Sequence, residues 1–175
     1  MSYFNRGLLL GAMTTGLLVM LPAAVVQAAL PPLACWVLLT VILVISLGCD
    51  ARILPWRLPQ NARLVPSDII VRTGGSGALQ FGFEMGTGMR TFLPSHLPYL
   101  ALGVALLVCP WWAAPLVGLS FGFGRTVMVR SAVASGSASS WDTAFNARRS
   151  VIYPVCWISA LTCLALLVSR VMPLA

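Results

Sequence analysis

Five long apolar stretches constrain the fold of this chain more strongly than any other feature. They cover residues 7–28, 31–48, 78–108, 111–130 and 151–169. A helix needs about 20 mostly apolar residues to cross the hydrocarbon core of a bilayer. Charged residues make up 9% of the chain, against about 25% in soluble domains. We therefore predict an all-α polytopic helix bundle that forms one integral membrane domain over residues 1–175.

The stretch 78–108 allows two interpretations, because five helix-breaking residues interrupt it: Gly82, Gly86, Gly88, Pro94 and Pro98. It is either two crossings that turn near the prolines or one long, broken crossing. Arginine placement distinguishes them, since short cytoplasmic loops carry the excess of basic residues. One crossing puts eight of the eleven arginines on the inner side, with the N-terminus: Arg6, Arg52, Arg57, Arg63, Arg72, Arg130, Arg148 and Arg149.

Two crossings would instead place the loop 130–149 outside and remove this bias. We therefore predict five crossings of the cell (inner) membrane with a broken third helix, a cytoplasmic N-terminus and an external C-terminus. The first stretch keeps a second interpretation. Arg6, the apolar run and Val26-Gln27-Ala28 resemble a secretory signal with a cleavage site. Cleavage of residues 1–28 would leave the remaining crossings unchanged.

Ionisable residues inside the third stretch are the main functional signal. Charged side chains at bilayer depth are costly and persist mostly where they pair or face a cavity. Pro94 cannot donate to the carbonyl of Arg90, so that carbonyl needs another donor. Broken helices lined with polar groups form binding sites in transporters. The candidate substrate-binding residues are Glu84, Thr87, Arg90, Thr91, His96 and Arg125.

An alternative places the break near the outer interface, where Arg90 would extend to the headgroups and His96 would lie in water. A further hypothesis concerns two charges on neighbouring crossings. Glu84 lies six residues after Ala78, about 9 Å along a helix, and Arg125 lies five residues before Arg130. In antiparallel crossings these depths match, which predicts a Glu84–Arg125 ion pair with either a structural or a functional role.

Glycine pairs at helical spacing indicate close helix packing. Two similar segments, ALQFGF at 78–83 and GLSFGF at 118–123, each take part in a pair of glycines four residues apart. The pairs are Gly82 with Gly86 and Gly118 with Gly122, and Gly7 with Gly11 has the same spacing. Glycines four residues apart share a helix face and allow a second backbone to approach. We expect Gly82, Gly86, Gly118 and Gly122 to bind a second copy of the chain or a partner membrane protein.

Composition and motifs argue against several functions. The net charge of +7 comes from arginines at the edges of apolar stretches, which indicates topology and not nucleic-acid binding. No pair of histidines and no phosphate-binding loop occurs, so we expect no enzyme activity and no cofactor. His96 is the one histidine and has no cysteine near it in sequence, which argues against a metal site. The five cysteines form no C-x-x-C and are expected to be small buried apolar residues.

Three segments in order resemble the membrane domain of the cytochrome c biogenesis and thiol-disulfide electron-transfer family. They are Arg52-Ile-Leu-Pro-Trp-Arg-Leu-Pro, the broken helix from Phe81-Gly-Phe-Glu-Met-Gly through Pro94, and Gly118-Leu-Ser-Phe-Gly-Phe-Gly. The resemblance covers about residues 33–170 and implies a similar scaffold. The family places a reactive cysteine beside the proline of the kink, whereas this chain has Leu93-Pro94-Ser95 and lacks the first cysteine-bearing span. The electron-carrying residues therefore cannot be assigned.

These observations predict three functions in order of preference. The first is a non-catalytic membrane subunit or assembly protein, since Glu84 is the one acidic residue within the predicted crossings. The second is a small permease-like transporter that uses the broken helix 78–108. The third is thiol-redox electron transfer across the membrane.

Overall fold

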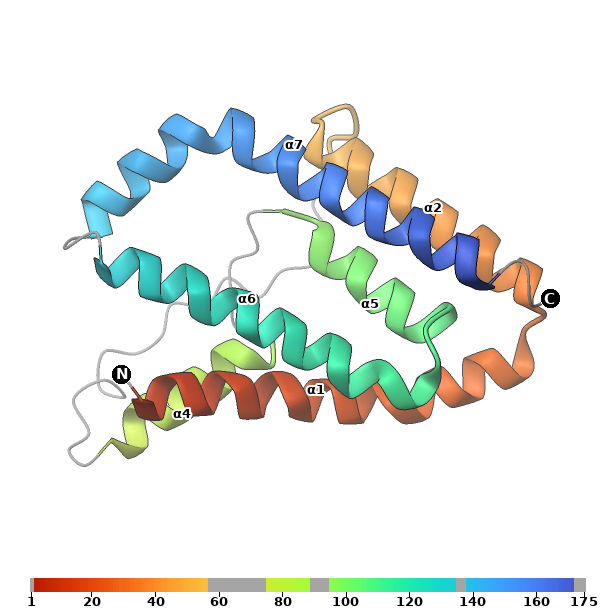
Figure 1. Ribbon diagram of the computed structural model, residues 1–175, viewed down its shortest axis with the longest axis horizontal. Coiled ribbons are helices and arrows are strands. Elements are labelled where there is room, and N and C mark those ends of the chain that lie inside the picture. Colours follow the sequence, from red (N-terminus) through yellow and green to blue (C-terminus); the bar gives the residue numbers. More distant parts are fainter. Residues whose placement is uncertain (1, 57–74, 89–94, 135–137, 172–175) are drawn as a thin grey trace. The chain divides into compact units, whose positions relative to one another are not determined.

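The computed structural model describes residues 2–56, 75–88, 95–134 and 138–171, and the regular structure of these residues is helical throughout. In chain order the elements are α1 (Ser2–Ala29), α2 (Pro32–Asp50), α4 (Ser76–Gly86), α5 (Leu97–Leu107), the 3-10 helix η1 (Trp111–Ala113), α6 (Ala114–Ala134) and α7 (Ala138–Val171) (Figure 1). The prediction of an all-α chain is confirmed. The chain forms two compact units, Met1–Val129 and Arg130–Ala175, which are described in turn.

Four of the described helical segments are long and apolar enough to cross a membrane. They are α1, α2, the segment Trp111–Ala134, and Thr143–Ser169 within α7. Each coincides with a predicted stretch. The fifth predicted stretch, 78–108, contains α4 and α5, of 11 residues each. At 1.5 Å per residue each spans about 16 Å, roughly half of a bilayer core.

Glycine and proline residues set the helix ends. Helix α2 begins at Pro32, whose missing N–H would have no partner in a first turn. Helix α4 follows Gly75 (φ 81°), and Gly88 (φ 73°) lies just beyond its C-terminal residue. Both conformations are left-handed and favour glycine. Helix α4 therefore ends at the glycines of the third stretch, and a broken crossing over 78–108 stays a prediction.

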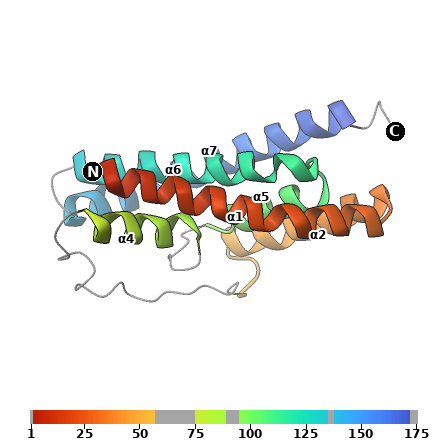
Figure 2. The same cartoon turned by 90° about the horizontal axis from the view of Figure 1, so that it is seen from below.

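Helices α1 and α4 pack backbone against backbone. A Cβ atom at Gly7 would lie 2.1 Å from the carbonyl oxygen of Leu79, and one at Gly11 would lie 2.1 Å from that of Phe83. From the other side, a Cβ atom at Gly86 would lie 2.1 Å from the carbonyl oxygen of Leu8. The contacts advance together along both helices, so α1 and α4 are parallel. Figure 2 shows α4 beside the N-terminal half of α1.

Helix α6 packs against α1 through a second set of small residues. A Cβ atom at Gly118 would lie 2.4 Å from the carbonyl oxygen of Ala12, and one at Gly122 would lie 2.6 Å from the Cβ atom of Ala12. One at Gly16 would lie 2.6 Å from the Cα atom of Pro115. Later residues of α6 meet earlier residues of α1, so these helices are antiparallel.

The glycine pairs make a close contact within the chain. The close approach predicted for Gly82, Gly86, Gly118 and Gly122 is made to α1 of the same chain. Small residues allow such contact because no side chain separates the backbones. Binding of a second copy or of a partner protein through these residues stays a prediction.

Helix α5 lies against the C-terminal part of α1 and against α2. The Nε2 atom of Gln27 donates to the carbonyls of Leu106, at 3.1 Å, and Cys109, at 2.8 Å, which lie at the C-terminal end of α5. A Cβ atom at Gly103 would lie 3.1 Å from the Cδ1 atom of Ile42 in α2. Asp50 at the C-terminal end of α2 contacts the start of α5, and Gln27 near the end of α1 contacts the C-terminal end of α5. Helix α5 therefore runs against α2 and in the direction of α1, as α4 does (Figure 1).

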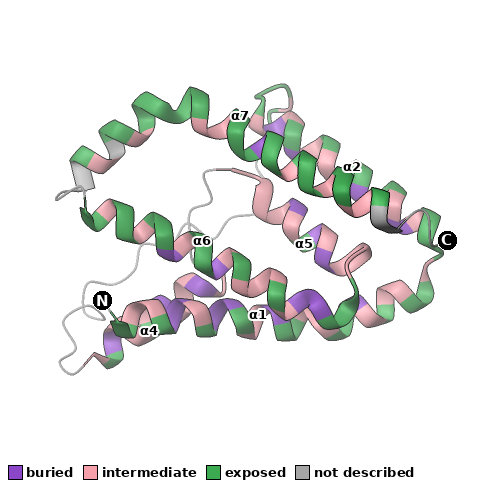
Figure 3. Cartoon of the chain, viewed as in Figure 1, coloured by how far each residue is buried: buried purple, intermediate pink, exposed green. Residues whose placement is uncertain are grey.

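The first unit buries few large side chains and exposes many apolar ones. Its most buried residues include Leu8, Ala12, Ala23, Leu39 and Ala114. By contrast, Leu18, Leu21 and Leu33 are more than 70% exposed. Figure 3 shows this alternation along α1 and α2. Exposed apolar surface of this extent is unfavourable in water but suits contact with lipid.

The second unit contains α7, one helix of 34 residues that includes the predicted crossing 151–169. Aromatic and cationic side chains pair along its first part. The rings of Trp141 and Phe145 stack with centroids 6.2 Å apart, and the guanidinium of Arg149 lies 4.9 Å from the ring centroid of Tyr153. Most described side chains of α7 are exposed (Figure 3).

Candidate functional site

The end of α2 positions the first member of the site, Asp50. After Asp50 the chain closes the helix with two bonds: the Ile53 N–H donates to the Gly48 carbonyl at 2.9 Å, and the Arg52 N–H donates to the Cys49 carbonyl at 3.1 Å. These are the two bonds of a Schellman motif. Arg52 takes the left-handed position of the motif, with φ 59°. Asp50 is thereby fixed in the last turn of an ordered helix.

Replacing Arg52 with glycine is expected to stabilise the protein by about 1 kcal/mol, since a residue with a Cβ atom is strained in the left-handed conformation. The midpoint of thermal unfolding in detergent should rise. Arg52→Ala is the matched control, because it also removes the charge but keeps the Cβ atom. Equal midpoints for the two variants would contradict the strain assigned to Arg52.

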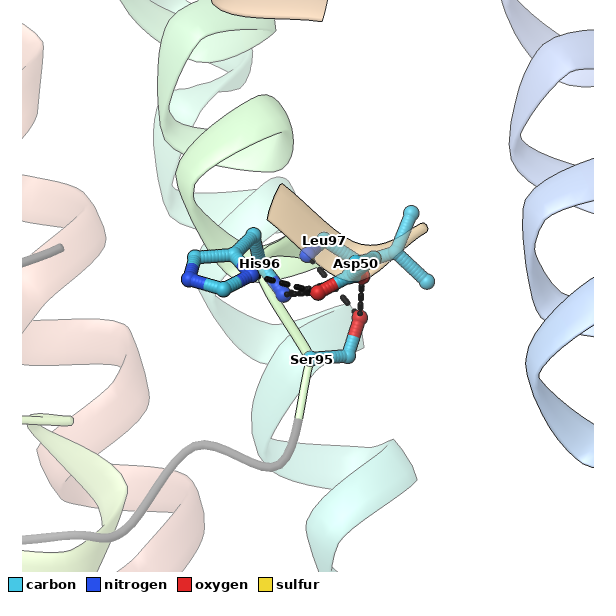
Figure 4. A network of polar contacts seen from close by, with 4 residues as sticks. All are labelled: Asp50, Ser95, His96 and Leu97. Carbon is cyan, nitrogen blue, oxygen red and sulfur yellow. Dashed lines mark hydrogen bonds and ion pairs between the residues drawn. The ribbon is translucent and has the colours of Figure 1, made fainter. Parts of the chain in front are cut away.

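Two residues at the start of α5 bind the carboxylate of Asp50 (Figure 4). The hydroxyl of Ser95 donates to Oδ2 at 2.7 Å. The backbone N–H of His96 donates to Oδ1 and Oδ2 at 3.0 and 3.1 Å. The Nδ1 atom of the His96 ring also pairs with Oδ1. Ser95 in turn accepts a bond of 3.2 Å from the N–H of Leu97, which ties the cluster to the first turn of α5.

This cluster is partly buried. The side chain of Asp50 is 4% exposed and that of His96 is 14% exposed. A carboxylate removed from water is tolerated where several donors bind it. Ser95, the His96 backbone and the His96 ring supply those donors, so the cluster joins two segments 46 residues apart in the sequence.

The ring of His96 has a defined tautomer in this arrangement. A carboxylate accepts at Nδ1, so the proton of the neutral ring lies on Nδ1 and the lone pair on Nε2. Nε2 lies on the side of the ring away from Asp50 (Figure 4). It is buried and has no hydrogen-bond partner in the part of the chain that the structure describes. The rings of Tyr99 and His96 stack with their centroids 6.3 Å apart.

In the neutral ring, the lone pair of Nε2 can accept a hydrogen bond. The arrangement offers no nucleophile activated by the histidine, because the Ser95 hydroxyl donates to Asp50 and not to the ring. The cluster is therefore suited to binding and not to acyl transfer.

The structure brings one predicted site residue, His96, into this cluster. The alternative in which His96 lies in water is wrong, because its side chain is largely buried against Asp50. Thr87 lies at the end of α4, where its hydroxyl donates to the Glu84 carbonyl at 2.8 Å and its carbonyl accepts from Thr15 at 3.3 Å. Thr87 thus joins α4 to α1. Arg90 and Thr91 lie outside the described residues.

Glu84 and Arg125 each have a local partner. The carboxylate of Glu84 accepts from the Nε2 atom of Gln80 at 3.3 Å, one turn earlier in α4. The guanidinium of Arg125 lies 5.6 Å from the ring centroid of Phe121 in α6, a cation–π distance. Neither contact joins the two helices, and the Glu84–Arg125 ion pair stays a prediction.

Sequence reasoning missed Asp50 as a site residue. Asp50 is one of four acidic residues and directly follows the apolar run of the second stretch. An acid at that position is a signal, because it must be either solvated or paired. Its partner could not be identified without the fold, since Ser95 and His96 lie in a different apolar stretch of the sequence.

No disulfide bond joins the five cysteines, and two of them are exposed, contrary to the expectation that all are buried. All five are free thiols: Cys35 and Cys49 are buried, Cys109 is half-buried, and Cys156 and Cys163 are exposed. Burial raises the pKa of the Cys109 thiol, which lies between α5 and η1. A raised pKa keeps this thiol protonated and weakly nucleophilic at neutral pH.

Comparison of the chain with protein-family models, with curated proteins and with solved structures found no match. The resemblance to the thiol-disulfide electron-transfer scaffold therefore stays a prediction, and the function has to be argued from the geometry.

Proposed function

We propose that this chain is a small permease-like membrane transporter whose solute site lies at the start of α5. The observation that carries this proposal is the partly buried Asp50–Ser95–His96 cluster, in which His96 Nε2 has no hydrogen-bond partner among the described residues. It stands at the N-terminal end of α5, beyond the end of α4. Transporters commonly place their sites where a crossing is interrupted, because polar backbone and side-chain groups become available there.

The proposal includes five crossings, with α4 and α5 forming one broken crossing. Helices α4 and α5 both follow the direction of α1, whereas α6 runs against it. Two separate crossings would run in opposite directions. Arginine placement then puts the N-terminus in the cytoplasm and the C-terminus outside the cell membrane.

Fusions of a reporter to truncated chains test this topology. In a bacterial host, green fluorescent protein fused after Ala134 should fluoresce, and alkaline phosphatase fused there should be inactive. Fusions after Val108 should give the reverse result. A fusion after Leu30 is the control, because it lies outside in both topologies. Active phosphatase after Ala134 would mean that 78–108 crosses twice.

The second candidate is the non-catalytic membrane subunit or assembly protein. It is favoured by the large exposed apolar side chains of α1 and α2, which a partner membrane protein could cover. The glycine faces that first suggested docking are occupied by α1. Docking does not require a polar cluster whose acceptor has no partner among the described residues, and this difference favours the transporter.

Osmotic re-swelling of proteoliposomes separates the two candidates, because a panel of solutes can be screened with the same vesicles. Purified protein is reconstituted, the vesicles are shrunk in solutions of glycerol, urea, a small sugar or an ammonium salt, and light scattering follows their recovery. We expect faster recovery than in protein-free vesicles for at least one solute.

The variant His96→Phe should slow that recovery about fivefold, since one lost hydrogen bond is worth roughly 1 kcal/mol. Thr40→Ala is the control, because the Thr40 hydroxyl is exposed and donates to the Trp36 carbonyl of its own helix. Recovery at the protein-free rate for every solute, with stoichiometric co-purification of one membrane protein, would favour the subunit instead.

A further inference from the structure

The Nε2 atom of His96 is the unused acceptor of the polar cluster. Nδ1, the backbone N–H, the Ser95 hydroxyl and the Asp50 carboxylate all take part in hydrogen bonds. Nε2 is buried without a partner in the described part of the chain. A buried acceptor without a donor is unfavourable, and such atoms in native structures call for a bound group that satisfies them.

We propose that His96 Nε2 accepts a hydrogen bond from the transported solute, which therefore carries an O–H or N–H group and no negative charge. This assignment rests on the proposed transport function. His96 is then the residue that contacts the solute. Asp50 is a positioning residue, since it fixes the ring and its tautomer, and Ser95 positions Asp50.

Charge sets the class of solute. The Asp50 carboxylate is 4% exposed and bonds the same ring that would bind the solute. In a site screened from water, a like charge is repelled much more strongly than on the surface. An anionic solute is therefore excluded. A neutral alcohol or a protonated amine is accepted, and the experiment distinguishes these two.

A metal ion fits this atom less well than a solute donor. Divalent metals in proteins are held by three or four side chains. Among the described residues, no group of three or more His, Cys, Asp or Glu side chains lies close enough to hold one. A metal ion at Nε2 would therefore have too few protein ligands among the described residues.

The chain contains a single histidine, so the ring can be observed directly. Protein labelled with ¹⁵N in the histidine ring is purified in detergent at pH 8.5, and its nitrogen resonances are recorded during titration. Glycerol and methylammonium chloride are the donor probes. Trimethylamine N-oxide, which can only accept, and sodium acetate, which is an anion, are the controls.

We expect the neutral ring to carry its proton on Nδ1. At least one donor probe should shift the Nε2 resonance saturably, and the two controls should leave it unchanged. A response to glycerol assigns a neutral hydroxyl solute, and a response to methylammonium assigns a cationic amine. A proton on Nε2, an equal shift with the controls, or no shift with either donor would overturn the proposal.

The variant Asp50→Asn tests the positioning role. Its amide can donate to Nδ1, so the ring proton should move in part to Nε2 and the donor probe should bind about tenfold more weakly. Ser95→Ala, a milder change, should keep the tautomer. If both variants fail to fold, the wild-type titration alone decides. Protein-dependent re-swelling without a shift of the Nε2 resonance would refute the role of His96 and leave the transport function standing. A shift of the resonance without re-swelling would refute transport and leave the binding site standing.

Discussion

Asp50→Ala is expected to destabilise the protein by about 3 kcal/mol or more. The carboxylate accepts from the Ser95 hydroxyl, the His96 backbone and the His96 ring, and each donor is left buried without a partner when the acceptor is removed. An unsatisfied buried donor costs about 1–3 kcal/mol. Chemical denaturation in detergent micelles, followed by tryptophan fluorescence, should show the loss.

Two further variants provide comparisons for the stability loss of Asp50→Ala. Asp50→Asn keeps one acceptor oxygen and the size of the side chain, so its loss should be smaller than that of Asp50→Ala. Thr40→Ala on the same helix should stay within about 0.5 kcal/mol of the wild type, as is usual for exposed positions, because its bond lies within its own helix. A stability of Asp50→Ala equal to that of Thr40→Ala would show that the cluster does not hold α2 and α5 together.

The same cluster shows where sequence reasoning ends. The apolar stretches predicted the helices because helix length and hydropathy are local properties. The interruption of 78–108 was predicted because its glycines and prolines act locally as well. The pairing of Asp50 with Ser95 and His96 depends on how α2 and α5 pack, and no local pattern specifies that partner.

The glycines show the same division. Their spacing predicted close helix packing, and the packing is observed. Their partner was expected to be another molecule and is α1, whose Gly7 and Gly11 carry the same spacing. A pair of small residues indicates that another helix can pack closely against this one, but it does not identify that helix. The site residue His96 was identified, since one histidine within an apolar stretch is conspicuous, whereas Asp50 at the end of a stretch was not.

Gly118→Ala and Gly124→Ala are expected to change stability in opposite directions, although both lie in α6. A Cβ atom at Gly118 would lie 2.4 Å from the backbone oxygen of Ala12, so α1 and α6 must separate. Overpacking of this kind costs about 1–3 kcal/mol, and more where backbone has to move. A Cβ atom at Gly124 would meet no described atom within 4 Å, and alanine favours a helix over glycine by up to about 1 kcal/mol.

The two variants make the same chemical change six residues apart, so the difference between them isolates the contact with α1. Thermal unfolding in detergent should place Gly118→Ala below the wild type and Gly124→Ala at or above it. Gly118→Val should fall further, because its branched side chain cannot leave the interface. Equal midpoints for Gly118→Ala and Gly124→Ala would mean that α6 does not approach α1. In that case the antiparallel pairing, and with it the five-crossing topology, would lose its main structural support.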